Sequence, residues 1–214
     1  MSRQDKLVIV SMLILASVFG LMAATEQFKR HQEQQRHLYG QVLQISPIEV
    51  IGQNPDYEGD PKSPFTLVEF GDYECPPCHA AFPLVQNMLK KYQGKVKFVF
   101  RNLPLVSIHP YAMSAAMTAV LARKQGQFWP VHDALYEIDP VFFNQSTIRS
   151  LRTEKTFKLK PANPNSTSVA KALIMTDIQE AAKLNINSTP TFLLCRPNGE
   201  VDHMNNLDQI EEFL

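Results

Sequence analysis

The sequence predicts an α/β domain with an inserted helical subdomain, preceded by an N-terminal transmembrane helix. Two patterns lead to this class: a long uncharged apolar run lies near the start of the chain, and beyond it apolar segments of strand length alternate with helical segments. A strand–helix–strand order implies a parallel βαβ unit. The 214 residues suffice for one domain with an insertion. A formal net charge of zero, without a basic block, argues against a nucleic-acid partner.

The N-terminal region predicts a membrane anchor followed by a stalk. Residues 7–24 are apolar apart from two serines, long enough to span a bilayer and longer than the apolar core of a usual signal peptide. Cleavage after Ala24 would place Met22 where a small residue is needed, so an uncleaved anchor is favoured over a cleaved signal. The polar, helix-forming residues that follow predict a solvated stalk. The predicted organisation is an anchor, a stalk and a domain, over residues 1–24, 25–45 and 46–214.

The first half of the domain is predicted to contain three strands and one helix. The short apolar run 48–52 predicts a strand and is followed by a loop rich in Pro and Gly. Residues 65–70 are an apolar run typical of a strand buried on both faces. Residues 80–94 carry apolar side chains at helical spacing and end in two lysines and a glycine, which indicates a helix. Residues 95–105 predict the next strand.

The second half is predicted to be a helical insertion followed by a β-hairpin. Residues from about 109 to 184 are mostly helix-forming, with Ala-rich stretches separated by Pro- and Asn-rich breaks. The apolar run 190–196 predicts a strand, Pro-Asn-Gly-Glu is a hairpin turn signal, and 201–204 is its antiparallel partner. Residues 207–214 predict a short terminal helix.

Two cysteines, separated by two prolines, stand where the second strand ends and the helix begins. The nucleophile in thiol–disulfide exchange is a thiolate, and a helix N-terminus lowers the pKa of a cysteine through its free N–H groups and dipole. Cys75 would cap the helix, and Cys78, one turn further, would lie close enough to bridge to it. Pro76 and Pro77 are tolerated in a first helical turn. The pattern predicts a redox pair in which Cys75 attacks and Cys78 resolves the mixed disulfide.

Two other interpretations of the pair are weaker. A structural metal site usually needs four ligands, and only His79 and Cys195 could join the pair, so no metal is expected. Two unrelated thiols in a turn are disfavoured because a strand before and a helix after are the context of a redox pair. Cys195 lies in an apolar strand, which predicts a small buried hydrophobe, with a regulatory or intermolecular thiol as the alternative.

Neighbouring charges are expected to adjust the pKa of Cys75. The two intervening prolines offer no N–H donor, so this pKa is predicted to fall less than in pairs that have a histidine between the cysteines. An imidazolium at His79 could offset that loss. Asp72 and Glu74 are expected on an exposed loop, where they would oppose a thiolate at Cys75.

Glu69 stands within the apolar strand 65–70, where a carboxylate is costly without a partner or a role. It is predicted to relay a proton to or from Cys78 with a raised pKa, and exposure at the strand end is the alternative. His109, at the start of the insertion, is expected to pack or cap a helix, with a place on the site's rim as the alternative. Trp129 is expected in the core.

The Thr189–Pro190 dipeptide opens the strand of the hairpin. Proline cannot donate to a strand ladder and is confined to strand starts or edges. A cis bond there would form a tight turn and leave the backbone of Thr189 free to pair with an extended peptide. Thr189, Pro190, Pro76 and Pro77 are therefore the expected substrate-binding residues.

Together these features resemble the thioredoxin superfamily and, within it, the DsbA-like thiol:disulfide oxidoreductases with a helical insertion. The resemblance rests on "LVEFGDYECPPC", "FVFRNLPLVSIHPYAMSAA", "QGQFWPVHDALYE" and "STPTFLL", in family order over roughly residues 48–200. It implies a thioredoxin fold, Cys75 as nucleophile, Cys78 as resolving cysteine, Glu69 as buried acid and Pro190 as the cis-proline. It also implies a domain on the extracytoplasmic, periplasmic side of a membrane. The Pro-Pro dipeptide is uncommon among strong oxidants of this family, which leaves the direction of transfer less secure.

The expected function is that of an enzyme, a membrane-tethered extracytoplasmic protein disulfide oxidoreductase whose only redox group is the Cys75–Cys78 disulfide. Expected partners are cysteine-containing substrate proteins and a membrane quinone-linked thiol oxidase or an electron-donor membrane protein. One alternative is a reductase or isomerase that runs the same chemistry in the reducing direction. The other is a non-catalytic, peptide-binding assembly factor.

Overall fold

The computed structural model describes residues 20, 22, 25–27, 42–43, 45–153, 157 and 159–214. The chain divides into two compact units, residues 1–41 and 42–214. Apart from residues 20 and 22, the predicted anchor lies outside the described residues, as does most of the predicted stalk. Among the residues that are described, no helix combines the length and the apolar character that crossing a bilayer requires.

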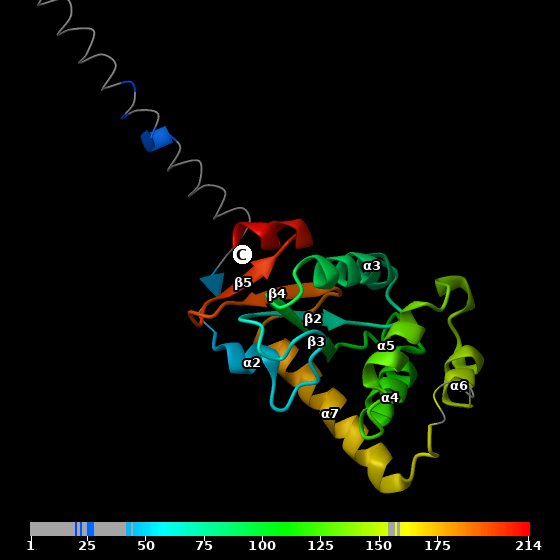
Figure 1. Cartoon of the computed structure of the whole chain (residues 1–214). Coiled ribbons are helices and arrows are strands. Elements are labelled where there is room, and N and C mark those ends of the chain that lie inside the picture. Colours follow the sequence, from blue (N-terminus) through cyan, green and yellow to red (C-terminus); the bar gives the residue numbers. More distant parts are fainter. Residues whose placement is uncertain are drawn as a thin grey trace, which may run out of the picture. The chain divides into compact units, whose positions relative to one another are not determined.

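The described part of the second unit contains a five-stranded sheet in the order β1-β5-β4-β2-β3 (Figure 1). β2 and β3 run parallel, with Glu69 opposite Phe100, whereas β4 pairs antiparallel with both β2 and β5. The predicted βαβ unit and the predicted hairpin are therefore confirmed. The strands are β1 (Val42–Leu43), β2 (Phe65–Gly71), β3 (Val96–Asn102), β4 (Thr191–Cys195) and β5 (Val201–Met204).

Helices cover both faces of the sheet, with α3 (Pro76–Lys91) on one side and α2 (Pro47–Ile51) and α7 (Pro164–Lys183) on the other (Figure 1). Because side chains alternate along a strand, neighbouring residues of β2 enter different cores. Leu67 packs in the core beneath α3, and Val68 packs in the core against α2 and α7. Both faces of β2 are thus buried, which explains its continuous apolar run.

The predicted strand over residues 48–52 is wrong, because this segment forms the helix α2. Pro47 occupies the first helical turn, where its missing N–H has no intrahelical partner to lose. The Glu49 carboxylate accepts a hydrogen bond from the N–H of Ser46, the N-cap residue, at 2.9 Å. These local capping contacts outweigh the strand preference of the isoleucines and valine. Val50 still enters the core, as the apolar pattern required.

The expected helical insertion between β3 and β4 is confirmed. It comprises α4 (Ala112–Arg123), α5 (Phe128–Tyr136), the 3₁₀ turn η1 (Pro140–Phe142), α6 (Gln145–Thr153) and α7. α7 begins where Asn163 accepts a hydrogen bond from the N–H of Ser166 at 2.8 Å. The predicted terminal helix is the 3₁₀ helix η2 (Leu207–Glu212).

Candidate active site

The cysteine pair lies where the sequence pattern placed it, at the junction of β2 and α3. Cys75 is the N-cap residue of α3, with extended backbone angles, and Pro76 and Pro77 occupy the first turn. The carbonyl oxygen of Cys75 accepts hydrogen bonds from the N–H groups of Cys78 at 3.0 Å and His79 at 3.1 Å. Both prolines are exposed, whereas both cysteines are buried free thiols.

The two thiols have opposite electrostatic environments. The pKa of Cys75 is lowered to about 6, chiefly by a hydrogen bond from the Cys78 thiol, against the opposing effects of burial and of the Asp72 carboxylate. Burial, followed by its hydrogen bond to Cys75, raises the pKa of Cys78 far above the usual thiol value. At neutral pH the pair therefore holds one thiolate, on Cys75, and one thiol proton, on Cys78.

The loop before β4 lies directly against Cys75. The Thr189–Pro190 peptide bond is cis, as predicted. When Cys75 is protonated, its thiol donates a hydrogen bond to the carbonyl oxygen of Thr189, 3.3 Å from the sulfur. The Thr189 hydroxyl is buried, and a hydrogen bond from the Thr189 side chain contributes to the lowered pKa of Cys75. The structure therefore brings both residues of the predicted peptide-binding turn beside the sulfur.

Glu69 is buried, with 2% of its surface exposed, so the alternative of a solvent-facing strand end is wrong. Burial and, to a lesser degree, the Cys75 thiolate raise its pKa to about 8. Its Oε1 has no hydrogen-bond partner among the described residues. Gly71 is needed nearby, because a Cβ at that position would lie 2.8 Å from Oε1 and 2.3 Å from the Phe100 ring. A protonated carboxyl group thus lies buried near the pair, able to exchange a proton.

Asp72 does not lie on an exposed loop, which corrects the expectation for this residue. Its side chain is fully buried and accepts hydrogen bonds from the N–H groups of Glu74 and Leu105 and from Nδ1 of His109, at 2.9, 2.8 and 2.7 Å. These contacts fasten the loop after β3 to the loop that carries Cys75. Through Asp72, His109 therefore stabilises the loop that carries Cys75. The opposition of Asp72 to a Cys75 thiolate, which the sequence suggested, does occur.

An aromatic cluster from α3, α5 and the sheet supports the site. The Tyr73 hydroxyl lies 3.0 Å from Nδ1 of His132, and burial lowers the pKa of this histidine to about 3, so His132 is uncharged. Trp129 makes an edge-type contact with His132 and packs, partly buried, against the core in which it was expected. Nothing in the sequence marked Tyr73 or His132 as neighbours of the site, because 59 positions separate them.

Cys195 is buried on the opposite face of the sheet, in the core against α2 and α7. Burial raises its pKa to about 12. It behaves as the small buried hydrophobe that its strand predicts, and it is separated from the redox pair by the sheet. Among the described residues, no group of three histidine, cysteine or acidic side chains is arranged to hold a metal ion.

Comparisons with known proteins agree with this geometry. Residues 53–214 match the model of the family described as thioredoxin. The chain is 34% identical to a Na⁺/H⁺ antiporter NhaA 3 of Salinispora tropica over 161 residues, which are 72% of this chain but 24% of the antiporter. The chain therefore spans about a quarter of that relative's length. It is 26% identical to the disulfide bond formation protein D of Bacillus subtilis, over 78% of this chain and 80% of that protein.

Solved structures show the same fold. A thioredoxin-like oxidoreductase from Silicibacter pomeroyi superimposes with a TM-score of 0.63 at 25% identity, over 78% of this chain and 95% of the other. Oxidised BdbD from Bacillus subtilis superimposes with a TM-score of 0.58 at 24% identity, over 82% of this chain and 94% of the other. Both matches cover the greater part of each chain.

Proposed function

Because this chain belongs to the thioredoxin family, we propose that it is a DsbA-like protein disulfide oxidoreductase, which transfers the Cys75–Cys78 disulfide to reduced cysteines of client proteins. One observation carries the proposal: a helix-capping cysteine with a lowered pKa lies beside a buried cysteine with a raised pKa. Such a pair divides the two tasks of thiol–disulfide exchange, since one sulfur is a good leaving group and the other retains a proton.

The reaction proceeds through a mixed disulfide. A client thiolate attacks the sulfur of Cys75, the Cys75–Cys78 bond breaks, and Cys78 leaves with the electron pair and takes up a proton. A second client thiolate then attacks the client sulfur of the mixed disulfide, and Cys75 leaves as a thiolate. The client loses two electrons and two protons. The enzyme gains the two electrons and one proton on Cys78, and the other proton goes to solvent.

Glu69 supplies the proton that Cys78 takes up. Its pKa of about 8 keeps it protonated at neutral pH. It shares a face of β2 with Leu67, which packs in the core that contains Cys78, and it acts electrostatically on Cys78. Loss of this proton to the leaving thiolate makes the first step hard to reverse. In this scheme the disulfide itself carries the electrons, so no further cofactor takes part.

The client chain binds across exposed apolar side chains near Cys75, namely Val106, Ile108, Val141 and Phe142, which are called the apolar rim below. On one side Val106 and Ile108 follow Leu105, whose N–H is bound by Asp72. On the other side Val141 and Phe142, exposed at 84% and 63%, precede Phe143, which packs against His79. The backbone of Thr189 beside Cys75 and the exposed residues Pro76 and Pro77 complete the proposed binding surface.

Residues 7–24 anchor the enzyme in a membrane, with the catalytic domain on the extracytoplasmic, periplasmic side. Their length and apolar character support this placement. A membrane-embedded, quinone-linked thiol oxidase then reoxidises the pair. The lowered pKa of Cys75 favours transfer in the oxidising direction, because a stable thiolate stabilises the dithiol form. The reduction potential of the pair tests this direction, and a value as low as that of thioredoxin would reverse it.

Trapping of clients tests the proposal. In Cys78→Ala the Cys75 thiolate attacks a disulfide of an oxidised client and displaces one client thiolate, and without Cys78 the mixed disulfide is not resolved, so clients should accumulate as disulfide-linked adducts that a reductant releases. The double variant Cys75→Ala, Cys78→Ala is the control and should trap none. An absence of adducts on Cys78→Ala, or full activity of Cys75→Ala in cells, would instead favour a non-catalytic binding protein.

A further inference from the structure

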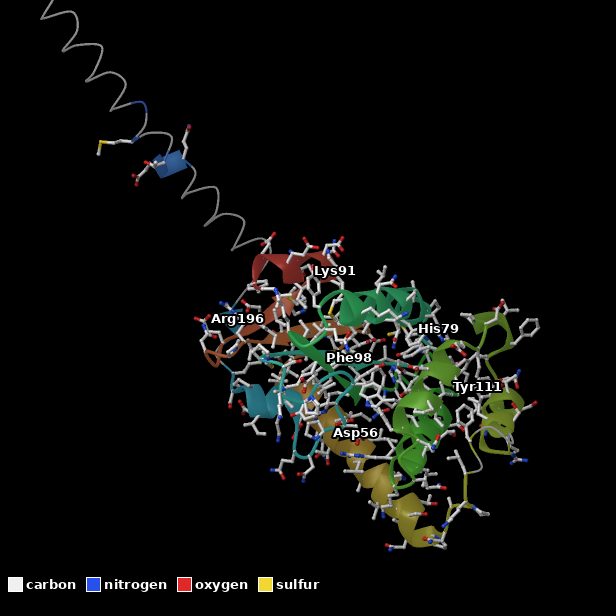
Figure 2. All side chains as sticks on the ribbon, in the orientation of Figure 1. Asp56, His79, Lys91, Phe98, Tyr111 and Arg196 are labelled. Atoms are coloured by element: carbon white, nitrogen blue, oxygen red, sulfur yellow. The ribbon has the colours of Figure 1, made fainter. Side chains whose placement is uncertain are left out.

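Tyr136, the last residue of α5, carries a buried hydroxyl group that the proposed reaction has not used. Tyr136 is 6% exposed, and its hydroxyl oxygen has no hydrogen-bond partner among the described residues. Its backbone is held in place, because its carbonyl oxygen lies 3.0 Å from Nδ1 of His79, the α3 residue labelled in Figure 2. A hydroxyl buried without a partner costs stability, so its presence calls for a functional explanation.

Glu69 is a second buried group of this core with a polar atom that lacks a partner. It lies opposite Phe100 in the pairing of β2 with β3, and the ring centroids of Phe100 and Tyr136 are 6.0 Å apart. Burial raises the pKa of Tyr136 and keeps it protonated, and Glu69, followed by Cys78, exerts the largest electrostatic effect on it. The hydroxyl therefore lies in the field of the two groups between which the proposed reaction moves a proton.

Tyr73 carries the other hydroxyl of the aromatic cluster that feels the charge of Glu69, but this hydroxyl has a partner. It lies 3.0 Å from Nδ1 of His132. The ring centroids of Tyr73 and Tyr136 are 5.0 Å apart, so both tyrosines belong to one packed cluster. Because a hydroxyl hydrogen rotates to suit its acceptor, the Tyr136 hydroxyl can turn toward a charge that forms nearby.

We infer that the Tyr136 hydroxyl donates its hydrogen to the Glu69 carboxylate that forms when Glu69 gives its proton to Cys78. Tyr136 keeps its own proton, so it stabilises the product of the transfer and makes Glu69 a stronger acid. Hydrogen bonds of this kind are often long in the resting enzyme and shorten as the reaction proceeds. Tyr136 is thus a positioning residue that acts through Glu69, and the inference rests on the proposed function.

The substitution Tyr136→Phe tests the hydrogen bond, because it removes the hydroxyl and retains the ring that stacks on Phe82. The pKa of Glu69 in the reduced protein should rise by about one unit, a tenfold change in its ionisation equilibrium, since a donor to the carboxylate is lost. The carboxyl band in the infrared spectrum, identified by its absence from Glu69→Gln, follows this titration. The other titratable groups on the elements packed around the two residues are Asp72, Tyr73, Glu74, Cys75, Cys78, His79, His132, Asp133 and Glu137.

The rate of disulfide opening gives a second measurement. A client thiol should open the Cys75–Cys78 disulfide of Tyr136→Phe about three- to tenfold more slowly than that of the wild type at neutral pH. In a Glu69→Gln background, Tyr136→Phe should cause no further loss, because a residue that acts through Glu69 then has no carboxylate to bind. Tyr57→Phe, which lies against the core on the opposite face of the sheet, is the matched control and should change neither the pKa nor the rate.

A purely structural role of the hydroxyl would give different results. Tyr136→Phe would then leave the pKa of Glu69 and the rate at wild-type values, which would overturn the inference. An equal loss of rate in the wild-type and Glu69→Gln backgrounds would overturn it as well, because Tyr136 would not act through Glu69. If the wild-type pair fails to exchange with client thiols, the proposed function fails, whereas the titration of Glu69 still tests the hydrogen bond.

Discussion

The sulfur of Cys75 lies 3.3 Å from the carbonyl oxygen of Thr189, 114 positions further along the chain. The contact exists because β2, which leads to Cys75, pairs antiparallel with β4, which Thr189 precedes. The C-terminal end of one strand and the N-terminal end of its neighbour therefore meet at one edge of the sheet. The reactive sulfur and the turn that receives a client chain are positioned by the same strand pairing.

Titration of the reduced protein should show one thiolate with a midpoint of about 6. Because the Cys78 thiol is the main donor to Cys75, Cys78→Ala should raise this midpoint. Below it, the rate of alkylation of Cys75 should fall about tenfold per pH unit, since only the thiolate reacts. Cys195→Ser is the control and should leave the midpoint unchanged. Equal midpoints in the wild type and in Cys78→Ala would contradict the assigned cause.

The substitution Glu69→Gln should stabilise the protein at alkaline pH. The folded-state pKa of about 8 exceeds the usual 4.5, so the stability linked to the protonated carboxyl is present below about pH 4.5 and is lost as pH rises to about 8. From about pH 5 to 8 the wild type should lose about 3 kcal/mol relative to the variant. Urea denaturation of both reduced proteins at the two pH values measures this. Glu212→Gln, an exposed control, should track the wild type.

Glu69→Gln should also slow the opening of the Cys75–Cys78 disulfide, the step in which Cys78 is the leaving group. Without the Glu69 proton, Cys78 leaves as an uncompensated buried thiolate, so opening of the disulfide by a client thiol should slow by about 10- to 100-fold at neutral pH. Stopped-flow reduction of the oxidised protein measures this rate. A rate for Glu69→Gln equal to that of the wild type would assign the carboxyl a purely structural role.

A substitution in the apolar rim should lower the rate of reaction with protein clients but not the rate with small thiols. Phe142→Ser removes a side chain that is 63% exposed, so folding should be little changed, whereas kcat/KM for a reduced protein client should fall about tenfold. The rate with glutathione should stay the same, because glutathione does not extend to the rim. Ile48→Ser removes a comparably exposed residue, on α2 across the sheet, and should alter neither rate. An unchanged client rate for Phe142→Ser would place client binding elsewhere.

Arg101 should be the most costly charge to remove from the described part of the fold. Its side chain is 5% exposed, and its guanidinium donates to Asp177 at 2.7 Å and to the carbonyl oxygen of Val50 at 2.8 Å and also pairs with Glu180. It joins β3 to α2 and α7. Arg101→Met should lower the free energy of unfolding by about 2–4 kcal/mol. Lys91→Met, which breaks an exposed pair with Glu211, is the control and should have little effect.

Each error in the sequence prediction has a specific physical cause. Residues 48–52 were assigned to a strand from their side chains, whereas the capping contacts of Ser46 and Glu49 and the position of Pro47 determine a helix. Asp72 was placed on an exposed loop because charged residues after a strand usually face water. Its burial is satisfied by two backbone N–H groups and His109, and such partners are created only by folding.

By itself the sequence determined the helix-capping position of Cys75, the spacing of Cys78, the burial of the strand that contains Glu69 and the turn at Pro190. Each follows from a local preference that acts over a few residues: a cap, one helical turn, an apolar run, or a proline that cannot donate. Tertiary structure alone decided which distant groups face the pair, namely Thr189 and the loop that the buried Asp72–His109 contact holds in place. The local Cys78 thiol chiefly lowers the pKa of Cys75, and Thr189 adds to this effect. The Thr189 contact depends on strand order, which no short stretch of sequence encodes.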